Sequence, residues 1–372
     1  MNYYLKILSC RSTLRFLPVY LLLFYSLSVP PAPLSAQNDT TKTKEQKKGP
    51  HKQDISLFGS DEILNVSLYL DLAAFAKKPS KSDSFDGTMT IHVNETDSIN
   101  RQITIKYRGI SRYEICTFPP MQINFKKSLY SDSSKIKKLK LVTHCQSNSV
   151  NDEYVVREYL VYKLFSALTD TSFKVRLLRV NYIDSKGNKK TISKYGIFIE
   201  PAELLAKRTN STVVKTVALN QTHIMPRVMD RLAIFNYMVT NWDWSIPGQH
   251  NVEVIKPLSY NPEGLGIAVP YDLDLTGVVN ADYAIPPENL GIENVRQPIF
   301  SGICRTKEVY TEDLKRFFEA KEKLYSVVNE FPHLNQRAKK DITNFLDQFF
   351  NQLEKPRSID NLVDVFLNNC KK

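Results

Sequence analysis

The sequence lacks several features that mark common classes of protein. No two of its cysteines have the spacing of a metal site, so a structural zinc centre is not expected. No glycine-rich phosphate loop is present in the β-rich first part of the chain. Basic residues occur in scattered pairs, without the aromatic-interleaved stripe of nucleic-acid binders, and there are no internal repeats. These absences indicate a non-repetitive globular protein of 372 residues without a nucleic-acid partner.

The N-terminal segment has the three parts of a secretory signal peptide. Three basic residues precede the apolar run 16–25, which is too short and proline-broken for a membrane span, and a small-residue cleavage site ends at Ala36. Cleavage after residue 36 removes three basic and no acidic residues, so the formal charge falls from +11 to +8. Residues 37–54 are polar and lysine-rich, and we expect a disordered tether. The sequence thus predicts an exported, periplasmic or extracellular protein without a stable membrane span; an uncleaved anchor is the alternative.

Four cysteines remain after this cleavage, an even number that favours disulfides in an exported chain. Cys116 and Cys145 flank neighbouring predicted strands, while Cys304 and Cys370 bracket the helical C-terminal part. Of the three possible connectivities we therefore predict the pairs Cys116–Cys145 and Cys304–Cys370.

The first half of the mature chain alternates apolar and polar residues, which is the pattern of β-strands. A helix is expected from Asn151, because Asp152 and Glu153 favour its N-terminus and an apolar face follows. Strands are expected over residues 66–72, 88–93, 101–107, 121–125, 138–142, 175–182 and 195–200. We interpret residues 55–200 as a small antiparallel β-rich lobe with one long helix.

After Pro201 the pattern becomes helical. Helices are expected over residues 202–208, 227–240, 312–330 and 334–353, followed by a short one that ends near Cys370. A β-rich lobe followed by a helical lobe over 201–372 predicts an α+β protein with two lobes around a cleft.

Two loops in the second half carry the residue types that phosphoryl transfer requires. One loop holds Asp243 and Asn251 before an extended run, and the other holds Asp272 and Asp274 after an apolar run. At strand spacing, Asp272 and Asp274 point to the same side. Phosphoryl transfer uses a carboxylate to orient the attacking hydroxyl and an Asn with a further Asp to hold Mg²⁺. A pair of Asx-stabilised turns on a secreted scaffold is the alternative.

Four stretches, in this order, resemble those of the CotH-like atypical kinases (spore coat protein H and its relatives), which have a protein-kinase-like fold. They are Arg108–Arg112, the strand and helix over 138–165, Tyr195–Glu200, and the two loops just described. The run Pro270–Asp274 followed by Ala281–Ala284 also resembles a group of exported bacterial proteins of unknown function. The resemblance implies a two-lobed fold with a small antiparallel first lobe and a larger, mainly helical second lobe.

The resemblance also implies roles for the residues of the two loops. Asp243 resembles the catalytic Asp that accepts the proton of the substrate hydroxyl. Asn251 and Asp272 resemble metal ligands, and Asp274 would be a second carboxylate on the metals. Seven residues separate Asp243 from Asn251, where ordinary protein kinases have four. The neighbouring His250 could line the site or cap a turn, and we favour the structural role.

Other matched positions would contact the nucleotide. Lys140 is a candidate phosphate-binding lysine, although Lys126 and Lys127 also qualify. Glu158 could be its ion-pair partner or a solvated helix residue. Glu200 resembles the end of the hinge between lobes, and the stretch from Arg108 is a candidate nucleotide cover in place of a glycine-rich loop.

The resemblance therefore predicts phosphoryl transfer from ATP, with Mg²⁺ or Mn²⁺, to a protein or glycan hydroxyl outside the cytoplasm. The alternatives are a catalytically silent, kinase-like binding protein of the envelope and a metal-dependent hydrolase. An enzyme requires Asp243 and Asp272 to face a common cleft, with at least one carboxylate pKa raised by like-charge crowding. An arginine that neutralises Asp272 would instead favour the binding protein.

Overall fold

The fold is known from a computed structural model that describes residues 57–129, 136–215, 218–259 and 261–371. The predicted signal peptide (1–36) and tether (37–54) lie outside the described residues. The described residues belong to one compact unit. The predicted boundary at residues 200 and 201 falls between a strand that ends at Ile199 and a helix that begins at Ala202.

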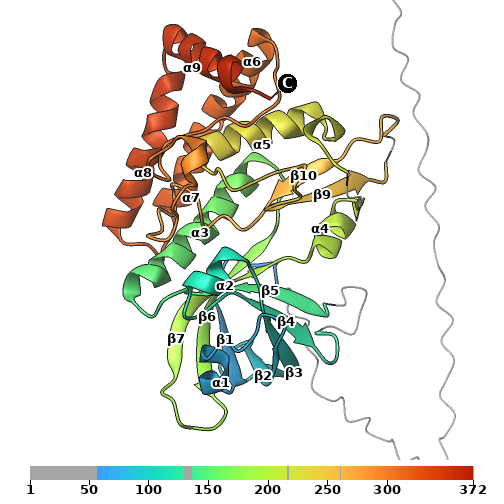
Figure 1. Cartoon of the computed structure of the whole chain (residues 1–372), viewed down its shortest axis with the longest axis vertical. Helices are drawn as coiled ribbons and strands as arrows, with labels where there is room; N and C mark the ends of the chain where they lie inside the picture. The colour runs from blue at the N-terminus through green and yellow to red at the C-terminus, as the bar shows by residue number, and fades with distance from the viewer. Residues whose placement is uncertain (1–56, 130–135, 216–217, 260, 372) are drawn as a thin grey trace, which may run out of the picture. The chain divides into compact units, whose positions relative to one another are not determined.

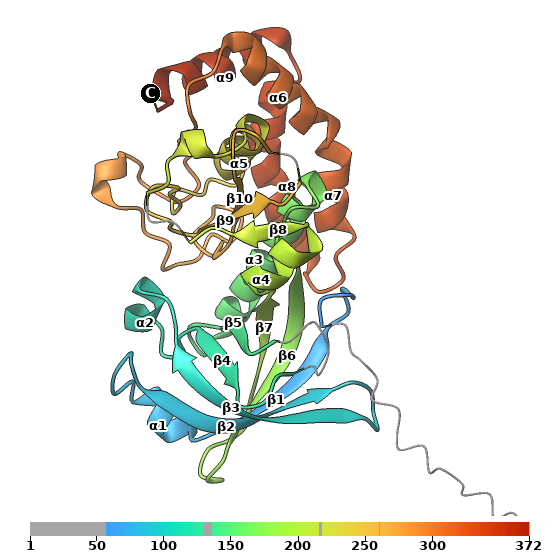
Figure 2. The ribbon, with the colours of Figure 1, turned by 90° about the vertical axis from the view of Figure 1, so that its right-hand side faces the viewer.

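Seven strands form a closed barrel in the order β1-β2-β3-β4-β5-β7-β6 (Figures 1 and 2). All neighbours pair antiparallel except β1 and β6, which are parallel and close the barrel. Alternate residues of each strand point inward, so that Met121, Ile123 and Phe125 of β4 are buried. The strands are β1 (Leu64–Leu70), β2 (Ser84–His92), β3 (Ser98–Tyr107), β4 (Met121–Phe125), β5 (Lys138–Val142), β6 (Val175–Asp184) and β7 (Ile192–Ile199).

The predicted two-lobed, protein-kinase-like fold is wrong. The strands lie close to where the alternation predicts them, but they close into a mixed seven-stranded barrel instead of a small antiparallel lobe. Closure depends on the parallel pairing of β1 with β6, in which Leu64 lies opposite Leu178. Apolar alternation shows which residues point inward but not which distant strand completes the sheet, so this pairing has no local signal.

Helices and a second, smaller sheet complete the described part. The long helix α3 (Ser149–Leu168) begins at the N-cap Asn148 and packs against β6, β7 and α7. The second sheet has the order β10-β9-β8 and is antiparallel. Its strands are β8 (Ser211–Val213), β9 (Val252–Pro257) and β10 (Ile267–Pro270). The other helices are α1 (Leu72–Ala76), α2 (Ser111–Ile115), α4 (Ala202–Arg208), α5 (Pro226–Met238), α6 (Lys307–Glu319), α7 (Lys321–Asn329), α8 (Gln336–Phe350) and α9 (Pro356–Asn369), with short 3₁₀ turns at Gln221–His223, Glu288–Leu290 and Asn351–Leu353.

Two apolar cores hold these elements together. One fills the barrel and includes Leu68, Met89 and Ile105. The other joins α3 to the second sheet and to the C-terminal helices, with Leu160, Phe235 and Phe366 fully buried. Within the described ranges, no helix combines the length and the apolar character that crossing a membrane requires.

Both predicted disulfides are confirmed. Cys116 is bonded to Cys145, and Cys304 to Cys370. Disulfides form and persist in oxidising compartments, so both bonds are compatible with an exported protein.

A histidine buried at one end of the barrel makes the stability of the fold sensitive to acid. His144 is stacked on Phe118 and lies beside Tyr182, and neither ring nitrogen has a hydrogen-bond partner. Burial, with the nearby Lys194 and Arg112, lowers the pKa of His144 from 6.5 to about 3. The fold therefore favours the neutral ring, and stability that is complete above pH 6.5 is lost as the pH falls from 6.5 towards 3.

We predict that His144→Phe removes this part of the acid sensitivity. Phenylalanine keeps the ring stacking and cannot be protonated. Between pH 7 and pH 4 the parent should lose about 3 kcal/mol more unfolding free energy than the variant. Urea unfolding at both pH values measures the difference, with His333→Phe as the control substitution. Equal losses in the parent and His144→Phe would contradict the prediction.

Candidate functional site

The second sheet brings the two predicted loops together. Asn251 directly precedes β9 and Asp272 follows β10, and these strands are paired so that Val252 lies opposite Pro270. The backbone N–H of Tyr271 donates to the carbonyl of Asn251 at 3.0 Å. Asn251 and Asp272 both have left-handed backbone, with φ of 52° and 56°. Asn and Asp adopt this conformation more readily than other non-glycine residues, and here it turns the chain next to each strand of the pair.

Three carboxylates form one cluster at this point. Asp272 and Asp274 meet Glu158 of α3, and one oxygen from each lies within 4.8 Å of the others. Both aspartates thus reach the same place, as predicted, although they lie in a turn after β10 and not in a strand. Glu158 is 1% exposed and Asp274 4% exposed. Glu158 Oε1, Asp272 Oδ1 and Asp274 Oδ2 are buried without a hydrogen-bond partner, so the cluster has unused ligand atoms.

Three basic side chains, two from the segment between β3 and β4 and one from β5, face these carboxylates. Arg108 Nη2 lies 3.5 Å from Asp272 Oδ2. Arg112 Nη1 lies 3.7 Å from Glu158 Oε2 and 3.6 Å from Asp274 Oδ2. Lys140 on β5 points across the ring of Tyr271, with Nζ 3.8 Å from the ring centre. Arg108 Nη1 and Arg112 Nε and Nη1 are also buried without a hydrogen-bond partner.

The charges of the cluster shift its pKa values in opposite directions. Burial and the neighbouring Asp274 raise the pKa of Glu158 well above its usual range, against the effect of Arg112. Burial, with Asp272 nearby, raises the pKa of Asp274 to about 6. Burial would also raise the pKa of Asp272, but Arg108, Arg112 and Lys140 hold it below its usual value. Burial and then Arg108 lower the pKa of Lys140 to about 8. The expected rise in a carboxylate pKa is therefore present in Glu158 and Asp274. Burial is its first cause, and repulsion between the neighbouring carboxylates is its second.

Asp243 lies close enough to this cluster for the charge of Asp272 to affect its pKa. Burial raises its pKa, and the charge of Asp272 adds to the increase. Its Oδ1 is paired with His250 Nε2 at 2.7 Å, and its Oδ2 accepts from Asn251 Nδ2 at 2.8 Å. Asn251 therefore holds Asp243 in place through its amide nitrogen. His250 is half-exposed and contacts Asp243, so it lies beside this candidate catalytic residue and not only in a turn.

Other predicted positions lie in different surroundings. Glu200 is buried, and its carboxylate is held by Arg208 and by the backbone N–H of Lys174. Lys126 is exposed and paired with Asp86. Of the lysines considered, Lys140 is the one that the structure places at the cluster.

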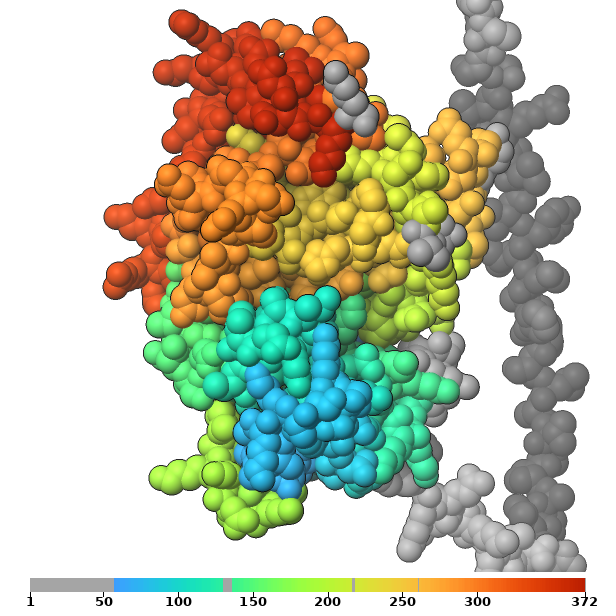
Figure 3. Space-filling view, in the orientation of Figure 1, coloured from blue at the N-terminus to red at the C-terminus, as the bar shows by residue number. Residues whose placement is uncertain are grey.

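Sequence reasoning assigned no role to several residues of the site. Arg112 belongs to the stretch predicted as a nucleotide cover but was given no individual role, and its burial between two carboxylates has no sequence signal. The hydroxyl of Tyr162 on α3 accepts a hydrogen bond from the backbone N–H of Asp272 at 2.8 Å. Tyr283 lies beside Arg112, whose guanidinium is 5.8 Å from the ring centre. On the face shown in Figure 3, the segment around α2 adjoins the orange segment around residue 283.

The contact of Arg108 with Asp272 is the feature expected of a binding protein, whereas the convergence of the carboxylates and the raised pKa of Asp274 are features expected of an enzyme. Comparison of the chain with protein families finds no match, and comparison with curated proteins finds none either.

Proposed function

We propose that this protein is exported and binds a divalent cation, Mg²⁺ or Mn²⁺, together with the phosphate groups of a nucleotide such as ATP. One observation carries the proposal: three clustered carboxylates, of which Glu158 and Asp274 are buried, have unpartnered oxygens and lie against arginine side chains with unpartnered N–H groups. Buried polar groups are nearly always paired in folded proteins. A cation would satisfy the oxygens, and phosphate oxygens would satisfy the arginines.

The residues fit these two partners by their chemistry. Hard cations such as Mg²⁺ prefer carboxylate oxygens, which Glu158, Asp272 and Asp274 supply. Arginine binds phosphate through charge-assisted hydrogen bonds, and Arg108 and Arg112 have the N–H groups for them. Lys140 adds a further positive charge beside Asp272.

Thermal-shift titration tests the proposal. A ligand that binds only the folded state raises stability by mass action, by about 2.7 kcal/mol at a hundredfold excess over its Kd. ATP should therefore raise the unfolding temperature of the mature protein in Mg²⁺ or Mn²⁺ and have little effect in EDTA. An equal shift with and without the metal, or no shift in either, would contradict the proposal.

Phosphoryl transfer to a protein or glycan hydroxyl is a second candidate function, favoured by the position of Asp243. Its carboxylate is oriented by His250 and Asn251, and it is near enough to Asp272 and Asp274 for their charges to affect one another. The acceptor oxygen would form a bond to the γ-phosphorus of ATP as the bond to the β,γ-bridging oxygen breaks and ADP leaves. A bound cation would neutralise charge on the phosphates, and Asp243 would accept the proton of the acceptor hydroxyl.

Asp243→Asn separates the two candidates. A protein that transfers phosphoryl groups would bind Mg-ATP within a few-fold of the parent and lose transfer to envelope proteins or glycans. Radiolabelled ATP with an extract of the cell envelope gives the readout. Release of free phosphate from the parent without any labelled acceptor would favour the metal-dependent hydrolase, and no release or labelling would leave binding as the function.

A further inference from the structure

The position of Arg112 suggests how many cations the site accepts. Its guanidinium lies between Glu158 and Asp274, two of the three clustered carboxylates. The side chain is buried, and its two contacts of 3.6 and 3.7 Å are longer than hydrogen bonds. Arg112 thus sits where a cation would lie between these two groups, but it does not use their oxygens fully.

We propose that Arg112 is a built-in cation that takes the place of a second metal, so that the site binds one divalent cation and one phosphate-like anion. This inference rests on the proposed function and specifies the ligands of that site. Asp272 would be the principal ligand of the single cation, because Arg112 pairs with the other two carboxylates and Arg108 contacts only Oδ2 of Asp272, which leaves Oδ1 without a partner.

Charge counting supports one cation. With the carboxylates ionised, as metal binding requires, the three clustered carboxylates and Asp243 carry −4, and Arg108, Arg112 and Lys140 carry +3, which leaves −1. One divalent cation changes the total to +1, a charge that attracts an anion, whereas a second would leave +3 in a buried site. Uncompensated charge is costly to bury, so the site with one divalent cation is favoured over the site with two. Binding of the cation would therefore prepare the site for phosphate oxygens.

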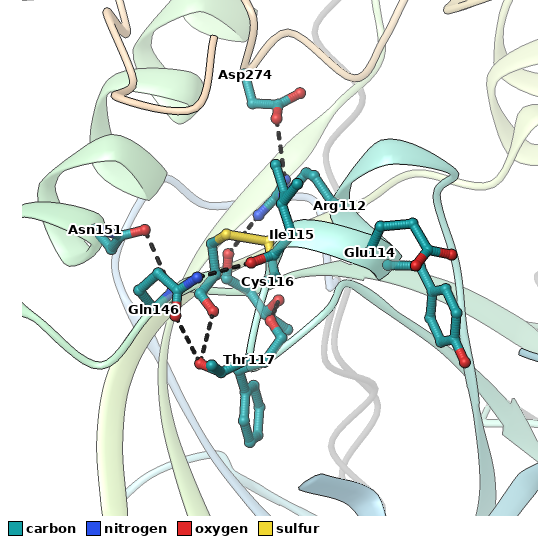
Figure 4. The surroundings of a disulfide bond; sticks show 12 residues. Arg112, Glu114, Ile115, Cys116, Thr117, Gln146, Asn151 and Asp274 are labelled. Atoms are coloured by element: carbon teal, nitrogen blue, oxygen red, sulfur yellow. Dashed lines mark hydrogen bonds and ion pairs between the residues drawn. A yellow bond between two sulfur atoms is a disulfide. The ribbon is translucent and has the colours of Figure 1, made fainter. Parts of the chain in front are cut away.

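The surrounding contacts fix Arg112 in this place (Figure 4). Its Nη2 donates to the carbonyl of Thr143 at 2.7 Å, and its own carbonyl accepts from the N–H of Cys116. Four residues after Arg112, Cys116 is bonded to Cys145, beyond β5. Gln146 also donates to the carbonyl of Ile115 at 2.8 Å. Because α2 is fastened to the segment 143–146 at these points, Arg112 cannot withdraw from the carboxylates when a metal arrives.

The proposal predicts opposite effects on cation and anion binding. Without the positive charge of Arg112, Mn²⁺ should bind at least about tenfold more tightly or at two sites, since a repelling charge within a few ångströms is removed. Pyrophosphate should bind the Mn²⁺-loaded protein at least about tenfold more weakly, since a charged donor is lost. If Arg112 had only a structural role, its substitution would weaken the binding of both Mn²⁺ and pyrophosphate.

The experiment compares four forms of the mature protein by calorimetric titration with Mn²⁺, and then with pyrophosphate at saturating Mn²⁺. They are the parent, Arg112→Gln, the double variant Cys116→Ser with Cys145→Ser, and the matched control Cys304→Ser with Cys370→Ser. Thermal unfolding checks that each is folded. The parent should bind one Mn²⁺, and Arg112→Gln should show the opposite effects just described. The first double variant should show them more weakly, because it frees Arg112 without removing it, and the control should match the parent.

Three results would overturn the inference. They are two equivalent Mn²⁺ ions in the parent, weaker binding of both ligands by Arg112→Gln, and unchanged binding by Arg112→Gln. If Arg112→Gln does not fold, the variant Cys116→Ser with Cys145→Ser replaces it in the test. Tighter Mn²⁺ binding with weaker pyrophosphate binding would support the inference, and weaker or unchanged binding of both would overturn it. A parent that binds no Mn²⁺ would instead overturn the proposed function and the inference with it.

Discussion

Asp272→Asn should abolish the metal-dependent binding of nucleotide while the protein remains folded. Asparagine has the same shape as aspartate but lacks the charge that holds a divalent cation, and its side chain can still meet Arg108. Loss of a residue behind a metal ligand already costs about 10–100-fold in affinity, so loss of the ligand itself should cost at least about 100-fold.

Calorimetric titration with Mg-ATP measures the loss, and circular dichroism shows whether the fold survives. Asp282→Asn is the matched control, because Asp282 is an exposed aspartate ten positions along the same segment. The control should bind like the parent. If Asp272→Asn bound Mg-ATP within a few-fold of the parent, the cluster would not be the cation site.

Arg208→Ala should have a large effect on stability for a change at a partly exposed residue. Arg208 holds the buried Glu200 through Nε, 2.9 Å from Oε1, and through Nη2, 3.0 Å from Oε2. It also donates to the carbonyls of Asp170 and Ser172. Its removal leaves a buried carboxylate with one backbone donor, that of Lys174. Breaking a buried ion pair costs about 3–5 kcal/mol, and about 3 kcal/mol is expected here because Arg208 is 25% exposed.

Urea unfolding tests this prediction with two companion variants. Adding Glu200→Gln to Arg208→Ala should recover part of the loss, since the unpaired charge is then gone. Lys307→Ala removes an exposed pair with Asp360 and should change the unfolding free energy by less than about 1 kcal/mol. A loss from Arg208→Ala no larger than that from Lys307→Ala would contradict the structural role assigned to this pair.

Local structure could be predicted from the sequence where it depends on neighbouring residues. Strands β4 and β5 and helix α4 begin and end at the predicted residues, because alternation and Pro201 define them. The predicted helix over 312–330 is instead two helices that meet at Ala320, where no proline or glycine marks the break. Barrel closure depends on a pairing between strands more than a hundred residues apart, and it was missed.

The residues of the candidate site likewise could be predicted only where the signal is local. The loops with Asp243 and Asp272 could be identified because their residue types and spacing are local. The disulfide pairs followed from the positions of four cysteines. The role of Arg112 could not be predicted, because it depends on contacts with Glu158 and Asp274 that exist only in the folded chain.

The account depends most on the claim that Glu158, Asp272 and Asp274 bind a divalent cation next to a phosphate group. Crystals of the mature protein grown with Mn²⁺ and a non-hydrolysable ATP analogue would test this claim directly, because anomalous scattering locates Mn²⁺ independently of any assumed site. The account predicts a single anomalous peak in contact with oxygens of these three residues, with phosphate oxygens against Arg108 and Arg112. A peak elsewhere, or phosphates away from both arginines, would contradict it.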